Sequence, residues 1–208
     1  MGVKDSLSGD NGKFLLLAFA LLVVSIIIVF VMNSGMYGLS GDLLNGKSTY
    51  SEPKEVLEEE YDYAILISTV YGDIQIDLYE DLAPKNVNSL LFLMGERYYE
   101  GLTIHKVVKD FVIQMGDAKG DGTGNPGYVV EQENVVSFED FEVGMANASQ
   151  FFIVLEGADK SSLDGNYSVV GKVTKGFAVL ESIGKVEING DYRPLNDIVI
   201  KSIQIQEN

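Results

Sequence analysis

The feature that most restricts how this chain folds is an apolar run, FLLLAFALLVVSIIIVFVM, which extends from Phe14 to Met32 without a charged residue. As a helix at about 1.5 Å per residue it is roughly 28 Å long, close to the ~30 Å hydrocarbon core of a membrane. A helix at the surface of a globular domain has a polar face, and this run has none. We therefore expect residues 14–32 to be a transmembrane anchor, preceded by a short N-terminal tail over residues 1–13. A cleaved signal peptide is the alternative, although its apolar region usually has about 7–15 residues.

The charges around this run predict its orientation. Lys4 and Lys13 precede it, and the first lysine after it is Lys47. Because positive flanks favour the cytoplasmic side, we expect a single-pass protein with a cytoplasmic N-terminus and an extracytoplasmic C-terminal domain. Residues 33–61 are rich in Gly, Ser, Asn and acidic residues and lack apolar periodicity. They are predicted to be a polar acidic linker, in which EPKEVLEEE is a candidate short helix begun by Pro53.

The overall composition limits the possible chemistry. The chain has 208 residues and a formal net charge of −16, with 31 acidic and 15 basic residues. Nucleic acids and anionic lipids require a basic face, so we expect neither as a partner. With no cysteine and a single histidine, disulfides and thiolate metal sites are excluded and a zinc site is not expected. DAKGDGTGN also lacks the glutamate that ends an EF-hand loop, so we expect neither metal nor cofactor.

From residue 62 onward the sequence has the pattern of a β-rich domain. YAILISTVYGDIQIDLYED alternates with period two on both sides of a Gly-Asp turn, as in a hairpin. Two segments have helical spacing instead, APKNVNSLLFLMGER and GFAVLESIGKV, the first with Pro84 in its first turn. Six further β-like runs are separated by Gly-rich turns: TIHKVV, DFVIQMGD, GYVVEQE, SQFFIVLE, YSVVGKV and IVIKSIQIQ. Many short strands with two helices predict a mainly β domain over residues 62–208, folded as a closed antiparallel barrel.

The order and spacing of several motifs resemble the cyclophilins, which are peptidyl-prolyl cis-trans isomerases. YGDIQIDLYEDLAPKNV is similar to the opening hairpin and Ala-Pro helix start of that family, and YYEGLTIHKVVKDFVIQMGD to its central motif. GDGTGNPGY, MANASQFFIVL and LDGNYSVVGKV match its Gly-rich loop and later strands. From about residue 64 to 205, the resemblance implies a closed eight-stranded antiparallel barrel capped by two helices. It also implies a groove on the outside of the barrel that binds proline-containing polypeptides.

The resemblance assigns residues to this groove. Phe111, Val112, Phe152 and Leu163 would form an apolar seat for the proline ring, and amide side chains would hydrogen-bond the peptide backbone. Lys106 occupies the position of the family's catalytic arginine. The implied catalytic residues are Lys106, Gln114 and Phe111, and the implied substrate-binding residues are His105, Val112, Ala146, Asn147, Gln150, Phe152, Leu163 and Tyr167.

The reaction explains why a cation is expected there. Rotation about a prolyl bond has a barrier of ~18–20 kcal/mol because amide resonance must be broken, and no covalent or metal-assisted step is needed. A cationic donor that favours the twisted state over either planar state lowers this barrier. Taken alone, Lys106 is also compatible with a solvated cation at a strand end, and Gln114 with a polar residue on an open strand face. His105 is more readily a packed turn residue, because the chemistry requires no acid–base step.

Four departures from the family pattern indicate a divergent active site. Lys106 keeps the charge of the arginine but lacks its planar fork. A Gly- and Asn-rich stretch usual in the family is missing after Ala148, and Tyr167 replaces a common histidine. Ser162 replaces a tryptophan that contacts cyclosporin in some members, so weak cyclosporin binding is expected. Two functions follow: an isomerase assisting protein folding at or outside the membrane, or a weakly active or inactive module that binds proline-containing segments.

Overall fold

The structure is a computed structural model that describes residues 47–58, 60–133 and 136–207. The expected tail and anchor, residues 1–32, lie outside the described residues. Within the described ranges, no helix is both long and apolar enough to cross a membrane. The residues from Lys47 onward form one compact unit, which begins earlier in the chain than the domain boundary expected at residue 62.

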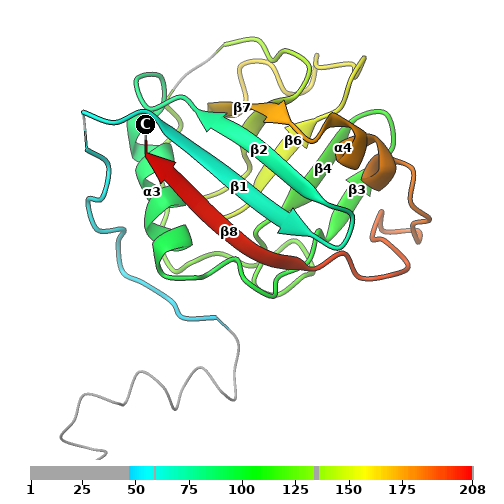
Figure 1. The fold of residues 1–208 in the computed structure, drawn as a ribbon, viewed down its shortest axis with the longest axis horizontal. Helices are drawn as coiled ribbons and strands as arrows, with labels where there is room; N and C mark the ends of the chain where they lie inside the picture. Colours follow the sequence, from blue (N-terminus) through cyan, green and yellow to red (C-terminus); the bar gives the residue numbers. More distant parts are fainter. Residues whose placement is uncertain (1–46, 59, 134–135, 208) are drawn as a thin grey trace, which may run out of the picture. The chain divides into compact units, whose positions relative to one another are not determined.

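The described residues contain eight strands and two helices, and α3 and α4 lie at opposite ends of the curved sheet (Figure 1). The sheet order is β3-β4-β6-β5-β7-β2-β1-β8, and every pairing is antiparallel. The predicted opening hairpin is confirmed as β1 and β2, and both predicted helices are present as α3 and α4. In chain order the elements are β1 (Tyr63–Thr69), β2 (Asp73–Leu78), α3 (Pro84–Gly95), β3 (Lys106–Val108), β4 (Val112–Met115), β5 (Glu142–Met145), β6 (Phe151–Val154), β7 (Val169–Lys175), α4 (Phe177–Gly184) and β8 (Ile200–Glu207).

The edges of the sheet meet only through a short contact. Within the described residues, β3 and β8 are the two ends of the strand order and form no ladder with each other. The segments just before them approach instead: Thr103 bridges Val199, and Ile104 N donates to Ile198 O at 2.9 Å. The sheet is therefore a half-barrel closed by a few hydrogen bonds, in place of the continuous ladder of the closed barrel that the sequence predicted.

One predicted strand was placed on the wrong segment. The run GYVVEQE, residues 127–133, forms no strand, and β5 comes from the later segment Glu142–Met145. β5 was not predicted because Gly144 interrupts the strand pattern of its sequence. Glycine in a strand weakens it. The alternation of GYVVEQE has another cause, because its glutamates contact helix α3.

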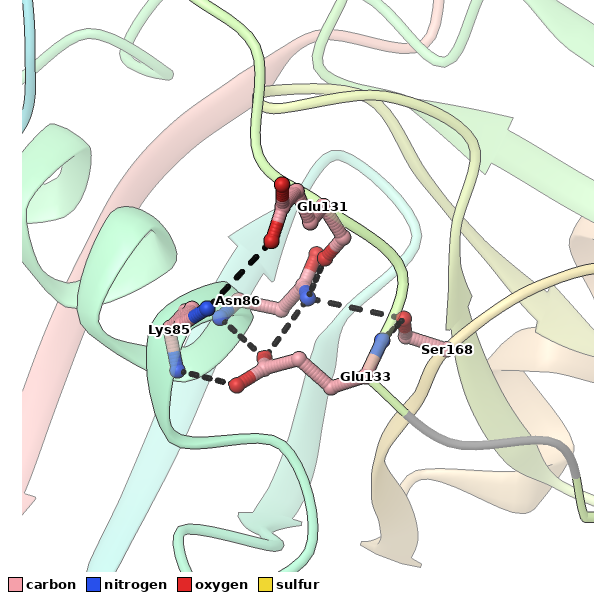
Figure 2. Close-up of polar contacts among 5 residues, drawn as sticks. All are labelled: Lys85, Asn86, Glu131, Glu133 and Ser168. Carbon is pink, nitrogen blue, oxygen red and sulfur yellow. Dashed lines mark hydrogen bonds and ion pairs between the residues drawn. The ribbon is translucent and has the colours of Figure 1, made fainter.

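Glu133 caps the N-terminus of α3 (Figure 2). The N-cap residue of this helix provides no side-chain hydrogen bond. The Glu133 carboxylate accepts from the backbone N–H groups of Lys85, at 2.9 Å, and Asn86, at 2.7 Å. Asn86 Nδ2 also donates to Glu131 O at 2.9 Å and to Ser168 Oγ at 3.4 Å. A carboxylate there satisfies free N–H groups and interacts favourably with the helix dipole, and the network fixes the path of residues 131–133.

Part of the expected linker packs on the domain. Residues 47–58 contain no helix, so the predicted short acidic helix is wrong for this segment. Asn88 of α3 accepts a hydrogen bond from Leu57 N at 3.0 Å and donates to Lys54 O at 3.0 Å. Tyr50 and Leu57 contact the main core. These isolated apolar residues have no period that sequence analysis detects. Asn88 is joined in the attachment by Lys47 Nζ, which donates to Glu100 O at 2.6 Å, and by Tyr50 N, which donates to Pro126 O at 2.7 Å.

Alternate residues of β4 and β6 face two separate hydrophobic clusters, because successive side chains of a strand point to opposite faces. In β6, Phe151 and Ile153 belong to the main core between the sheet and the helices, whereas Phe152 and Val154 belong to a smaller cluster on the other face. In β4, Val112 joins this second cluster. The second cluster is where the sequence placed the proline seat.

Candidate active site

The four residues predicted as the apolar seat come together in the second cluster. Val112 on β4 and Phe152 on β6 lie on neighbouring strands, and Leu163 reaches them from the loop before β7. All three are buried, whereas Phe111 and Tyr167 are half-buried at the margin. The ring of Tyr167 meets that of Phe152 edge-on, with centroids 5.2 Å apart. The seat is therefore a packed floor with two aromatic residues at its accessible edge.

Two residues that sequence analysis missed support this floor. Phe138 packs against Phe152 with ring centroids 5.6 Å apart, and both rings lie over Gly144 of β5. A Cβ atom at Gly144 would lie 2.7 Å from Phe138 Cζ and 2.7 Å from Phe152 Cε2. Only a glycine leaves room for both rings. The sequence feature that could have indicated this packing is Gly144, which comes directly before the motif MANASQFFIVL.

An amide pair links the groove to the Gly-rich loop. Gln114 Nε2 donates to Gln150 Oε1 at 2.9 Å. Gln150 is 1% exposed, and its Nε2 donates to Gly124 O at 2.7 Å and Gly122 O at 3.2 Å. Gln150 therefore acts as an internal bridge that orients Gln114. Gln114 is only partly buried and stands opposite Lys106 in the β3–β4 register.

The side chain of Asn147 closes a tight turn. Its Oδ1 accepts from Ser149 N at 2.9 Å and Gln150 N at 2.8 Å, and its Nδ2 donates to Gly124 O at 3.1 Å. Ala146 N donates to Gln150 O at 2.8 Å, which completes the turn where the usual family loop is missing. The Asn147 side chain thus has internal partners. Hydrogen bonds from Ala146 or Asn147 to a peptide stay a prediction.

His105 is packed, as the residues alone favoured. It is 5% exposed, and among the described residues neither ring nitrogen has a hydrogen-bond partner. Burial lowers the pKa of His105, and the charges of Lys106 and Arg193 lower it further, against the opposing effect of Asp117 and Asp121. The ring is therefore held neutral. It contributes to a cavity wall without a charge of its own.

Lys106 lines a cavity that includes Gln114 but none of the four residues of the apolar seat. The cavity has a volume of about 670 Å³. Lys106 is half-buried, and its Nζ lies 6.0 Å from the centroid of the Tyr192 ring. The remaining lining comes from His105, Gln114, the loop 120–122 and the loop 189–193. The last of these loops had no role in the sequence prediction, because it is far from the other site residues in the chain.

An apolar seat beside an amide pair and a cation, on the outside of an antiparallel half-barrel, suits the binding of an extended peptide around a proline. Over residues 64–205 the chain matches the family described as "Cyclophilin type peptidyl-prolyl cis-trans isomerase/CLD". The chain belongs to this family, and its activity is peptidyl-prolyl cis-trans isomerisation, EC 5.2.1.8.

Individual relatives support the same assignment. Peptidyl-prolyl cis-trans isomerase 10 of Caenorhabditis elegans is 35% identical over 157 residues, which cover 70% of this chain and 96% of the relative. The crystal structure of a cyclophilin-type isomerase of Cryptosporidium parvum has a TM-score of 0.66 and 29% identity, covering 71% of this chain and 99% of that one. A second structure of the Cryptosporidium protein, determined in the presence of the dipeptide Ala-Pro, has a TM-score of 0.65 and 30% identity, covering 70% of this chain and 99% of that one. The matched part thus corresponds to nearly all of these relatives.

Proposed function

We propose that this isomerase is tethered to a membrane and acts on exposed proline-containing segments of proteins at or outside that membrane. The apolar run at residues 14–32 and the lysines before it support the tether and its orientation. A folding helper is useful there because uncatalysed prolyl isomerisation takes tens of seconds or longer. The presence of Lys106 and Gln114 at one cavity beside the apolar seat carries the proposal for the site.

In the proposed site, three groups of side chains act on different parts of the peptide. Phe111, Phe152 and Leu163 hold the proline ring by apolar contact. Gln114, oriented by Gln150, hydrogen-bonds the backbone next to the proline. The ammonium of Lys106 interacts with the peptide most strongly in the twisted state, in which the prolyl nitrogen becomes pyramidal and gains a lone pair. No proton transfer is required, which is consistent with the neutral, buried His105.

A fragment spanning residues 47–208 is suitable for testing this site. It contains the whole compact unit, and the matched residues cover almost the full length of relatives that lack the N-terminal segment. Cis-trans exchange in a short Ala-Pro peptide is measured by NMR exchange spectroscopy. We expect Lys106→Ala to slow exchange and Lys106→Arg to accelerate it. Lys109→Ala, at an exposed neighbouring lysine, is the matched control and should have no effect.

The outcome also separates two candidate functions. If Lys106→Ala retains the full rate, our role for Lys106 is wrong. If the unaltered fragment binds the peptide without accelerating exchange, it is a binding module. The tight turn at Asn147 and the flexible stem of Lys106 favour this second candidate. For either function we propose weak cyclosporin binding, because an exposed serine, Ser162, stands beside the seat in place of an aromatic ring.

The membrane role needs the full chain. We expect sealed, right-side-out vesicles containing it to lose the C-terminal domain to external protease. A domain protected until the vesicles are permeabilised would reverse the proposed orientation. A chain released from the vesicles by carbonate washing would exclude the anchor.

A further inference from the structure

The loop 188–194, which forms one wall of the Lys106 cavity, is tightly constrained. Ile188 bridges Pro194, and Asn189 Oδ1 accepts from the backbone N–H groups of Asp191, at 2.9 Å, and Arg193, at 3.0 Å. Tyr192 has a φ of 63°, in the left-handed region that costs most side chains about 1–3 kcal/mol. Such a conformation persists only where the surroundings impose it.

This loop is attached directly to the strand that carries Lys106. Val107 N donates to Tyr192 O at 2.8 Å, and the Tyr192 ring lies beside the Lys106 ammonium. The left-handed conformation of Tyr192 thus positions its carbonyl and its ring toward β3 at once. The residue that follows, Arg193, also lines the cavity.

Arg193 is held more firmly than Lys106. One terminal nitrogen donates to Gly120 O at 3.1 Å, and the other lies 3.4 Å from Asp197 Oδ1. A guanidinium has five N–H groups, so about three stay available for a ligand, and the side chain is 43% exposed. Within the described part of the chain, Lys106 makes no hydrogen bond or ion pair, and its ammonium lies 6.0 Å from the centroid of the Tyr192 ring. Both cations act on the same buried ring, because each lowers the pKa of His105.

We propose that Arg193 is a second cation of the prolyl site, and that its guanidinium supplies the planar, pre-oriented donor that position 106 lacks. The inference rests on the proposed site at Lys106 and extends it. Asp121 and Asp191 line the same cavity, so its two positive and two negative side chains balance. Arg193 therefore adds a positively charged donor with a fixed direction, which hydrogen-bonds a peptide carbonyl next to the proline in addition to Lys106.

A merely structural role for Arg193 makes a different prediction. Its bond to Gly120 O supports the loop whose carbonyls at Gly122 and Gly124 hold Gln150. If Arg193 only supports this loop, a neutral hydrogen-bond donor is sufficient, and glutamine provides one. A substrate-binding cation needs the positive charge, which lysine provides.

The test compares Arg193→Ala, Arg193→Gln and Arg193→Lys in the 47–208 fragment, using exchange in the Ala-Pro peptide and thermal unfolding. Losing one well-placed donor costs about 10²–10³ in rate, and because Lys106 remains we expect a loss of roughly tenfold for alanine. Glutamine should resemble alanine, and lysine should retain part of the rate, because it keeps the positive charge but lacks the planar fork. All three variants should unfold near the temperature of the unaltered fragment. Arg97→Ala is the matched control, because Arg97 is an exposed arginine that pairs with Glu100 outside the cavity.

Three results would overturn the inference: a full rate in Arg193→Ala, a full rate in Arg193→Gln, or a loss of rate explained by a lower unfolding temperature. Combining Arg193→Ala with Lys106→Ala separates this inference from the role of Lys106. A further drop in the double variant supports two cations. If Lys106→Ala alone slows exchange and Arg193→Ala does not, the second cation fails while the first stands. If only Arg193→Ala slows exchange, the role proposed for Lys106 fails and that of Arg193 stands.

Discussion

Replacing Gly144 by alanine tests whether the proline seat depends on the packing beneath it. The new Cβ atom would lie 2.7 Å from Phe138 Cζ and from Phe152 Cε2. Phe152 Cζ would lie closer still. Carbon atoms normally approach to about 3.5–4.0 Å, so the Phe152 ring must move by roughly 1–2 Å. Phe152 has little space for this movement, because it lies between Phe138 and Tyr167 with centroid distances of 5.6 and 5.2 Å.

The expected magnitude follows from this overpacking. Adding a carbon atom to a close-packed core costs about 1–3 kcal/mol. For a domain of this size, each kcal/mol lowers the unfolding temperature by about 2–4 °C, so Gly144→Ala should lower it by roughly 2–12 °C. If about 1 kcal/mol of the strain is expressed in the seat, the Kd for an Ala-Pro peptide rises about fivefold.

Circular dichroism melting and peptide titration of the 47–208 fragment measure both effects. Gly95→Ala is the control, because a Cβ atom at this last residue of α3 meets nothing within 4 Å. In a helix, alanine is more favourable than glycine by about 0.5–1 kcal/mol, so this variant should unfold at the same or a slightly higher temperature. Equal melting temperatures and equal peptide affinities for Gly144→Ala and the unaltered fragment would refute the reasoning.

Two further variants probe the packed histidine and the helix cap. Burial lowers the pKa of His105, so below about pH 6.5 the unfolded state takes up the proton first, and stability falls from there toward the lower folded pKa. His105→Phe should lose less stability than the unaltered fragment in urea unfolding between pH 7 and 5.5, and parallel pH dependences would contradict this. Glu133→Gln should lower the free energy of unfolding by about 1 kcal/mol, because it removes the charge at the N-terminus of α3. Glu131→Gln, whose exposed carboxylate pairs with Lys85, should lower it by less than about 0.5 kcal/mol, and equal losses would argue against the cap.

The sequence predicted those parts of the fold and site that lie on regular strands. Period-two alternation located the hairpin of β1 and β2. The resemblance to the cyclophilins assigned Val112 and Phe152 to one groove, and in the structure both residues belong to the second cluster. β5 was missed because Gly144 removes a side chain from its pattern. The reason for that glycine lies across the sheet, in the rings of Phe138 and Phe152, and no local pattern contains it.

The parts that escaped prediction depend on contacts distant in the chain. Tyr192 and Arg193 reach Lys106 only because a constrained loop folds back onto β3, and the sequence around them has neither apolar period nor motif. The packed part of the expected linker was missed for the same reason, since its partners are distant in the chain and include Asn88, a buried polar residue within a helix. The missing loop after Ala148 was visible in the sequence. The way in which Asn147 closes the shortened turn was not.

The effect on the isomerisation rate of having lysine in place of arginine at position 106 can be estimated from the surroundings of Lys106. Lysine and arginine both carry about 2 kcal/mol of rotamer entropy, but the planar guanidinium loses less of it per hydrogen bond. A ring near a cation contributes about 0.5–1 kcal/mol at an exposed site, and Tyr192 lies at the outer limit of that interaction, 6.0 Å from Lys106 Nζ. If the guanidinium loses almost none of this rotamer entropy, the disadvantage of lysine is at most about 2 kcal/mol. The ring offsets up to about half of that and leaves roughly 1 kcal/mol. Lys106→Arg should then raise kcat/KM for an Ala-Pro peptide by about fivefold. An increase near a hundredfold would show that the native lysine contributes almost nothing to the twisted state, and that the cavity was shaped for another purpose.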